Sequence, residues 1–237
     1  MLPLRDDIPS RTIPVVTIAI IILNTLAFFY ELSLGRQIEY LLLDWAIVPR
    51  RYTDLDVARH FSIPEQATPF LTSMFLHGGW LHLIGNMWTL WIFGDNVEDR
   101  LGHRKFLGLY LVSGFAAGLV HIVTNTDSML PTIGASGAVA GIMGAYFRFF
   151  PHARVHMIIP PLFFGPVFVV PAVIFLGWWF LLQFFNGTVS LIANRSDFGG
   201  VAWWAHVGGF VIGMGLVLFA PRKRAVTRYD FDESYRG

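Results

Sequence analysis

The sequence predicts an all-α protein that crosses a membrane six times, and two observations lead to that class. Hydrophobic residues make up 54% of the 237 residues and charged residues only 14%, whereas a typical soluble domain has about 25% charged residues. The apolar residues also gather in six runs, which approach the roughly 20 residues that a helix needs to cross a bilayer. We expect a single membrane domain over residues 1–237, with its core at about 14–220 between a short N-terminal segment, 1–13, and a C-terminal tail, 221–237.

The same composition excludes several other classes of protein. Disorder requires low hydrophobicity and high net charge, but the formal net charge here is +1. A nucleic-acid binder needs a basic surface, yet 17 Lys and Arg are balanced by 16 acidic residues. Because the chain has no cysteine, it cannot form disulfides, thiolate nucleophiles or Cys-containing zinc sites.

The first three predicted spans follow one another with charged residues between them. Residues 14–34 form an apolar run that exceeds the roughly 7 to 15 residues of a signal peptide and has no cleavage site after it, so we expect a retained helix. Residues 77–94 form the second span. The third, residues 106–124, comes after a charged stretch.

The last three predicted spans contain more glycine and proline. Residues 134–150 form a short, glycine-rich span. Residues 168–186 form the fifth, in whose first turn Pro171 is tolerated. The sixth span, residues 201–220, is stopped by Pro221 and the basic residues after it.

The distribution of Lys and Arg predicts the orientation of the spans. With the N-terminus inside, 12 of these residues fall on the inner side and five on the outer side. Cytoplasmic loops carry the excess of positive charge, so both termini are expected in the cytoplasm. The longest connection, residues 35–76, mixes apolar and charged residues and is expected to pack as an amphipathic loop at the outer interface.

A few polar residues within the spans are candidates for function, because such groups are costly in a bilayer. They are His82, Asn86, His121, Ser136 and His206. Apart from His121, all lie roughly 3 to 14 Å into spans that run from the outer face inward, at about 1.5 Å per residue. A serine hydroxyl, an imidazole and two hydrogen-bond donors at similar depth are the groups required for acyl transfer.

Glycines beside these residues predict close packing of two spans. Gly137 and Gly141 follow Ser136, and Gly209 and Gly213 follow His206, each pair at a spacing of four. Small residues at that spacing let helix backbones approach one another. Two short side chains on separate helices could then meet.

Each polar residue also has a simpler interpretation. Ser136 alone could bond its own helix backbone, and His121 is taken as a structural hydrogen-bond partner. His82 and Asn86 share a helix face and could join two helices. Three histidines could serve as ligands of a zinc ion, but the sequence has no zinc-binding motif and no nearby carboxylate ligand. We therefore expect neither a metal nor a cofactor. A channel or carrier is another class to consider. The predicted spans have no carboxylate near their middle, which disfavours it.

Read in order, these motifs resemble the rhomboid family of intramembrane serine proteases. The matching segments are Gly134-Ala135-Ser136-Gly137, the His82 and Asn86 pair, and Ala205-His206 with Gly209. The similarity covers about residues 70–220. It implies a six-helix bundle of rhomboid type.

The resemblance also implies roles for individual residues. Ser136 would be the nucleophile and His206 the general base and later acid. Asn86, His82 and the backbone N–H of Ser136 would stabilise the oxyanion. Where some members have a tyrosine that stacks on the histidine, this chain has Ala140, so any stacking group must come from elsewhere.

The activity implied is that of a serine endopeptidase that cuts membrane proteins in or near their transmembrane segments. The partners would be single-span membrane proteins and the lipid bilayer, with no nucleic acid and no metal. The expected location is a bacterial cytoplasmic membrane. The alternative is a catalytically inactive relative that binds membrane helices without cutting them; such proteins typically lack the serine or the histidine.

Overall fold

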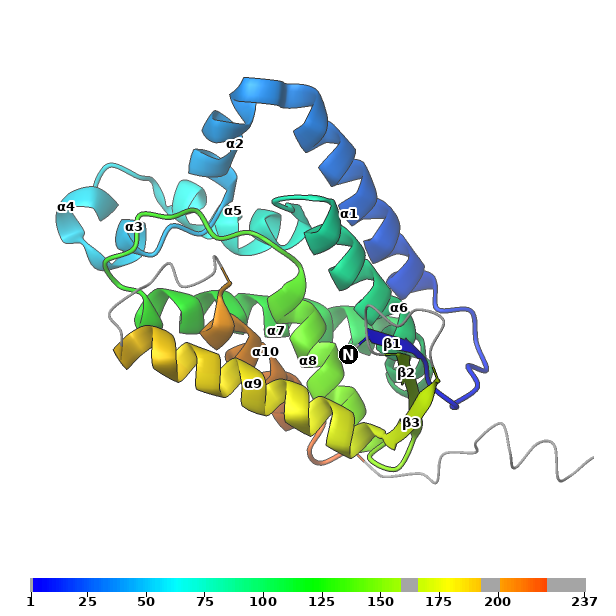
Figure 1. Cartoon of the computed structure of the whole chain (residues 1–237). Coiled ribbons are helices and arrows are strands. Elements are labelled where there is room, and N and C mark those ends of the chain that lie inside the picture. The colour runs from blue at the N-terminus through cyan, green and yellow to red at the C-terminus, as the bar shows by residue number, and fades with distance from the viewer. Residues whose placement is uncertain (1, 159–165, 193–200, 221–237) are drawn as a thin grey trace, which may run out of the picture.

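The computed structural model describes residues 2–158, 166–192 and 201–220, and it is mostly helical (Figure 1). A helix occupies most of each apolar run. The long helices are α1 (Val15–Leu34), α6 (Trp80–Leu101), α7 (His103–Thr124), α8 (Ser136–Phe149), α9 (Ala172–Ile192) and α10 (Trp203–Leu216). Within the described residues, three helical stretches are long and apolar enough to cross a membrane: Val15–Trp45, His103–Thr124 and Ala172–Ile192.

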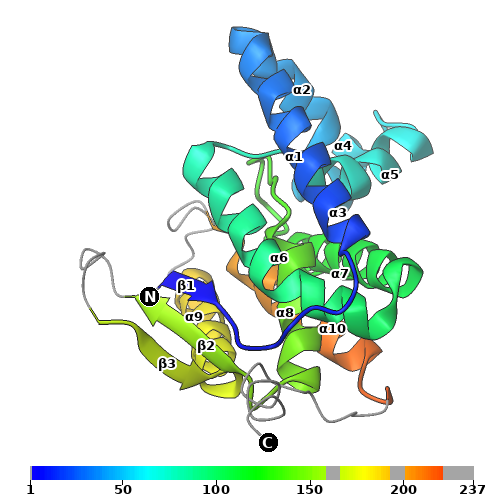
Figure 2. The same cartoon turned by 90° about the vertical axis from the view of Figure 1, so that its right-hand side faces the viewer.

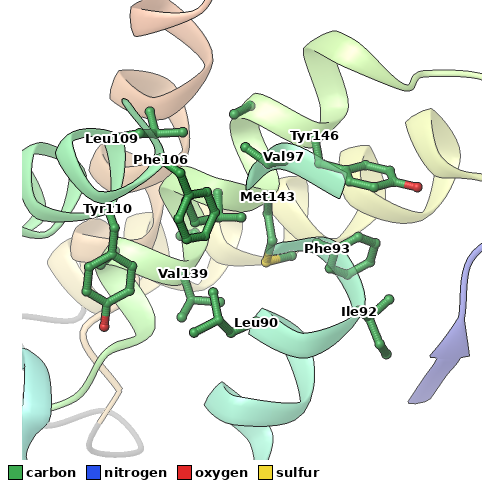
Figure 3. Packing of buried hydrophobic residues seen from close by; sticks show 14 of the residues in the cluster. Leu90, Ile92, Phe93, Val97, Phe106, Leu109, Tyr110, Val139, Met143 and Tyr146 are labelled. Carbon is green, nitrogen blue, oxygen red and sulfur yellow. The ribbon is translucent and has the colours of Figure 1, made fainter. Parts of the chain in front are cut away.

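Helix α8 lies at the centre of the bundle, with α6, α7, α9 and α10 packed around it and α1 on the outside against α6 (Figures 1 and 2). Eleven of its 14 residues are buried. Figure 3 shows how aromatic and aliphatic side chains of α6 and α7 pack against it. Phe93 and Phe106, for example, are fully buried beside Met143 and Tyr146 of α8. A helix that is buried nearly all round is the rigid element on which a site can be built.

The backbones of α8 and α10 approach closely along the predicted glycines. A Cβ at Gly209 would lie 2.0 Å from the carbonyl oxygen of Gly137, and one at Gly213 would lie 2.0 Å from that of Gly141. On its other side, Gly137 faces Ala117 of α7, whose Cβ a new methyl would meet at 2.5 Å. Any side chain at these positions would push the helices apart.

The connection between α1 and α6 folds into short helices rather than an irregular loop (Figure 1). They are η1 (Gly35–Gln37), α2 (Ile38–Trp45), α3 (Arg50–Thr53), α4 (Leu55–Ala58), α5 (Ile63–Thr72) and η2 (Ser73–Phe75). The buried Arg51 guanidinium of α3 joins α2 and α5: it donates to the carbonyls of Leu43 and Glu65 and stacks on Phe61 at 3.8 Å. Ser62 and Glu65 form a capping box at the start of α5.

The prediction of an all-α protein is wrong in one respect, because three short strands form an antiparallel sheet (Figure 2). β1 (Leu2–Arg5) pairs with β2 (Arg154–Ile158), and β2 with β3 (Phe168–Pro171). Pro171 therefore ends a strand rather than lying in the first turn of a helix. Strands of four or five residues leave too little periodicity to be recognised in the sequence, and β1 and β2 are about 150 residues apart.

The N-terminal segment is anchored to the bundle through polar contacts. The indole of Trp88 donates to the carbonyl of Pro3 at 2.6 Å, and the Tyr146 hydroxyl donates to Asp6. The Asp7 carboxylate accepts from the backbone N–H of Arg154 at 2.8 Å. Residues 221–237, expected to form a C-terminal tail, lie outside the described residues.

Helix α6 extends beyond the predicted end at Gly94 and stops at Gly102, which has a positive φ of 78°. Its last two turns are polar, so hydropathy alone did not mark them as part of the helix. The extension has a structural role. The buried carboxylate of Glu98 accepts from the backbone N–H groups of Val16 and Thr17 at 2.8 Å, and it caps α1 from a neighbouring helix.

Candidate active site

Two residues that are far apart in the sequence meet at the interface of α8 and α10. Ser136 is the first residue of α8, and His206 lies in the first turn of α10. The Nε2 atom of His206 lies 2.7 Å from the Oγ atom of Ser136, within the range of a strong hydrogen bond. Both side chains are half-buried. The glycines one turn further along each helix allow this approach.

Asn86 and His82 lie one turn apart on α6, and His82 approaches the turn that leads into Ser136. Asn86 is 7% exposed, and its buried Nδ2 has no hydrogen-bond partner among the described residues. A buried donor without a partner costs about 1–3 kcal/mol. Such a cost is understandable where the missing acceptor is a ligand atom.

His82 lies next to the backbone just before Ser136. A Cβ at Gly134 would lie 2.6 Å from Nε2 of His82 and 3.7 Å from Oγ of Ser136. Gly134 has a φ of 129°, a conformation that L residues rarely adopt. Glycine here serves two purposes: it makes the turn into α8 and leaves room for the imidazole of His82.

A small cavity of about 40 Å³ opens beside Ser136. Its polar lining comes from Ser73, His121, Thr132 and Ser136. A cavity needs roughly 10–15 Å³ and two to four polar partners to hold a water molecule. The space therefore suits water next to the serine hydroxyl.

His121 has partners of its own within this region. Its Nε2 atom lies 2.7 Å from the Thr132 hydroxyl, and its Nδ1 atom lies 3.2 Å from the amide nitrogen of Asn125. Both ring nitrogens are thus engaged away from Ser136. This is the structural role expected from the sequence.

Two residues of α9 complete the surroundings of His206, and the sequence reasoning did not select either of them for this. The Oε1 atom of Gln183 lies 2.9 Å from Nδ1 of His206. The indole of Trp179 lies beside the imidazole, with ring centroids 5.9 Å apart and planes inclined by 32°. Gln183 could have been noticed as an amide within an apolar run, since polar residues in spans are costly.

The described hydrogen-bond partners of His206 are therefore neutral: a hydroxyl and a carboxamide. Within the same parts of the chain, no group of three or more His, Cys, Asp or Glu side chains is arranged to hold a metal ion. The arrangement can remove a proton from the serine hydroxyl and can present donors to an oxygen beside it. Those are the requirements of acyl transfer by a serine nucleophile.

Comparison with known proteins yields one consistent family. The sequence-family model of the Rhomboid domain matches residues 64–223 of the chain. The chain is 32% identical over 160 residues to the mouse presenilin-associated rhomboid-like protein, mitochondrial. These aligned residues are 64% of this chain and 38% of the relative. It is 31% identical over 146 residues to the yeast Rhomboid protein 1, mitochondrial, or 60% of this chain and 38% of the relative.

A plant protein extends the comparison. RHOMBOID-like protein 5 of Arabidopsis thaliana is 37% identical over 75 residues, or 32% of this chain and 24% of the relative. The chain thus matches between 24% and 38% of the length of these three relatives. Two of them are named as mitochondrial, so they do not support the expectation of a bacterial cytoplasmic membrane.

Proposed function

The chain belongs to the rhomboid family, and from this membership we propose that it is an intramembrane serine endopeptidase that uses Ser136 and His206 as a dyad. The observation that carries the proposal is the 2.7 Å separation between Nε2 of His206 and Oγ of Ser136. The residues are 70 positions apart and stand on helices held in contact by glycine. The glycines bring the two helices close enough for the short serine side chain to reach the imidazole, and this supports a functional pairing over a chance contact.

In the first half of the reaction, Oγ of Ser136 attacks the carbonyl carbon of the peptide bond while its proton passes to Nε2 of His206. The tetrahedral intermediate then collapses. The C–N bond breaks, and Nε2 returns the proton to the leaving amine, which leaves an acyl group on Ser136. Water from the adjacent cavity attacks this ester with Nε2 as base, and it releases the acid product and the free serine.

The negative charge of the intermediate would be held by donors on two elements. The partnerless Nδ2 of Asn86 supports a role as a donor to the oxyanion. His82 lies four residues earlier on the same helix, next to Gly134. The backbone N–H of Ser136 is one of the first N–H groups of α8, which have no partner within the helix and lie at its positive end.

The proposed setting is a bundle of six spans with both termini in the cytoplasm. The substrates would be single-span membrane proteins, because the dyad stands on two helices of an apolar bundle. A peptide bond inside an intact helix is shielded by its neighbours, so the substrate must unwind locally. Because the dyad is expected in the outer half of the membrane, cleavage is expected near the outer end of the substrate helix.

The test is cleavage of a transmembrane substrate by Ser136→Ala and His206→Ala variants of the full chain. Both should lose cleavage while their thermal midpoints stay near that of wild type. The matched control is Ser113→Ala, because Ser113 is also buried against α8, close to Gly141; it should cut normally. If the two dyad variants still cut, the assignment is wrong. If wild type itself does not cut, the inactive helix-binding alternative is favoured.

A further inference from the structure

Gln183 lies where the third member of a catalytic triad would lie. It is 7% exposed on α9, and its Oε1 atom is 2.9 Å from Nδ1 of His206. The other ring nitrogen, Nε2, faces Ser136 at 2.7 Å. The imidazole is therefore held at both nitrogens by side chains from two different helices.

A second contact of the amide determines which of its two ends faces the histidine. The Nε2 atom of Gln183 lies 3.3 Å from the carbonyl oxygen of Trp179. A carbonyl only accepts, so this end of the amide must be the NH₂ group. The end toward His206 is then the oxygen, which accepts but cannot donate.

An acceptor at Nδ1 decides where the proton of a neutral imidazole resides. Nδ1 must carry the hydrogen in order to donate to Gln183, which leaves a lone pair on Nε2 directed at the hydroxyl of Ser136. This is the tautomer that the proposed reaction needs, because only an unprotonated Nε2 can take the serine proton. The opposite tautomer would place a hydrogen between Nε2 and Oγ and leave Nδ1 opposite another acceptor.

We propose that Gln183 is a positioning residue of the dyad: its amide oxygen holds His206 in the Nδ1–H tautomer and in the orientation that presents Nε2 to Ser136. The inference rests on the proposed function and deepens it, because it assigns the orienting role to a neutral amide. Trp179, one turn earlier on α9, lies against the ring of the same histidine. It supplies an aromatic contact with His206 that Ala140 cannot make, so α9 provides both an edge contact and a face contact.

This arrangement ties catalysis to the position of α9. The dyad stands on α8 and α10, which are in close backbone contact, whereas much of α9 is exposed, as at Phe185 and Trp178. A movement of α9 that broke the bond from Nδ1 would free the histidine to rotate or to change tautomer. Activity should therefore depend on α9 being in place, even when Ser136 and His206 are undisturbed.

Steady-state kinetics of Gln183 variants test the proposal. Gln183→Leu should lower kcat roughly 10- to 100-fold, since a hydrogen bond to the active base is lost, while KM stays within about twofold. Gln183→Glu keeps an oxygen acceptor at the same length and should retain kcat within about threefold. The control is Thr188→Val, which removes a hydroxyl that bonds only the backbone of α9 and should leave kcat unchanged.

A purely structural role gives a different pattern. The inference is overturned if Gln183→Leu keeps its kcat, or if Leu and Glu variants lose activity equally and in step with their thermal midpoints. Should the Leu variant not fold, Gln183→Met, which keeps the unbranched shape, makes the same comparison.

A spectroscopic readout separates this inference from the proposed function. In ¹⁵N NMR of histidine-labelled protein, with the His206 signals assigned from a His206→Ala spectrum, wild type should show a protonated Nδ1, and Gln183→Leu should show a mixture. A wild type that cuts its substrate but carries the proton on Nε2 would refute the role of Gln183 alone. Absence of cleavage with Nδ1 protonated would refute the protease instead.

Discussion

Replacing Gly209 with alanine should separate the two helices that carry the dyad. The new Cβ would lie 2.0 Å from the carbonyl oxygen of Gly137, the residue that follows Ser136. Ordinary contacts of a Cβ begin at 3.4 Å, so α10 and α8 must move apart by about 1.4 Å. The obstacle is backbone on a buried helix, which cannot turn aside as a flexible side chain would.

The size of the effect follows from this displacement. Gly209 is one turn from His206, so a similar widening would stretch the 2.7 Å contact between Nε2 and Oγ to about 4 Å, beyond hydrogen-bonding distance. Misplacement by about 1 Å can cost roughly 10²-fold in rate, and we expect kcat to fall by that order. Overpacking typically costs roughly 1–3 kcal/mol of stability, so the variant should fold with a lowered thermal midpoint.

The assay is cleavage of a transmembrane substrate in detergent, with the thermal midpoint measured on the same samples. Gly215→Ala is the matched control, because it lies on the same helix and a Cβ there meets nothing within 4 Å. Alanine is favoured over glycine in a helix by roughly 0.5–1 kcal/mol, so the control should be fully active and no less stable. Unchanged kcat in Gly209→Ala would refute the argument that glycine packing sets the dyad distance.

Two further variants examine other parts of the molecule. Asn86→Ala should lower kcat roughly 10²- to 10³-fold, the usual value of one oxyanion donor, with little change in KM; a change in KM alone would contradict that role. Burial raises the pKa of the Asp6 carboxyl to about 7. Folded protein therefore binds this proton more tightly than unfolded protein, and stability contributed by protonated Asp6 is lost as the pH rises from 3.8 to about 7. Asp6→Asn should show a smaller fall in thermal midpoint between about pH 5 and pH 8 than wild type; an equal fall in both proteins would show that Asp6 titrates normally.

The positions of the long helices could be predicted because each contains an apolar run of suitable length. Their ends were harder to predict. The polar end of α6 is helical because Glu98 caps α1 there, a contact between distant segments that hydropathy does not record. The sheet was missed for a related reason: β1 is stabilised by pairing with β2 and by contacts such as the one from Trp88, rather than by its own sequence.

The candidate site shows the same division. Ser136, His206 and their glycines could be selected because their residue types and spacing carry chemical information. Gln183 and Trp179 could not be assigned, because an amide and an indole on an apolar helix have no defined partner until the helices are placed. Which residues surround a catalytic base is decided by packing between helices.

The central claim, that Ser136 is an activated nucleophile, is tested most directly by reaction with a serine-reactive fluorophosphonate, followed by mass spectrometry of the adduct. The account predicts a single adduct on Ser136 that disappears in His206→Ala, because the hydroxyl is activated only by the imidazole 2.7 Å away. An adduct on any other residue, or equal labelling of Ser136 without His206, would contradict it.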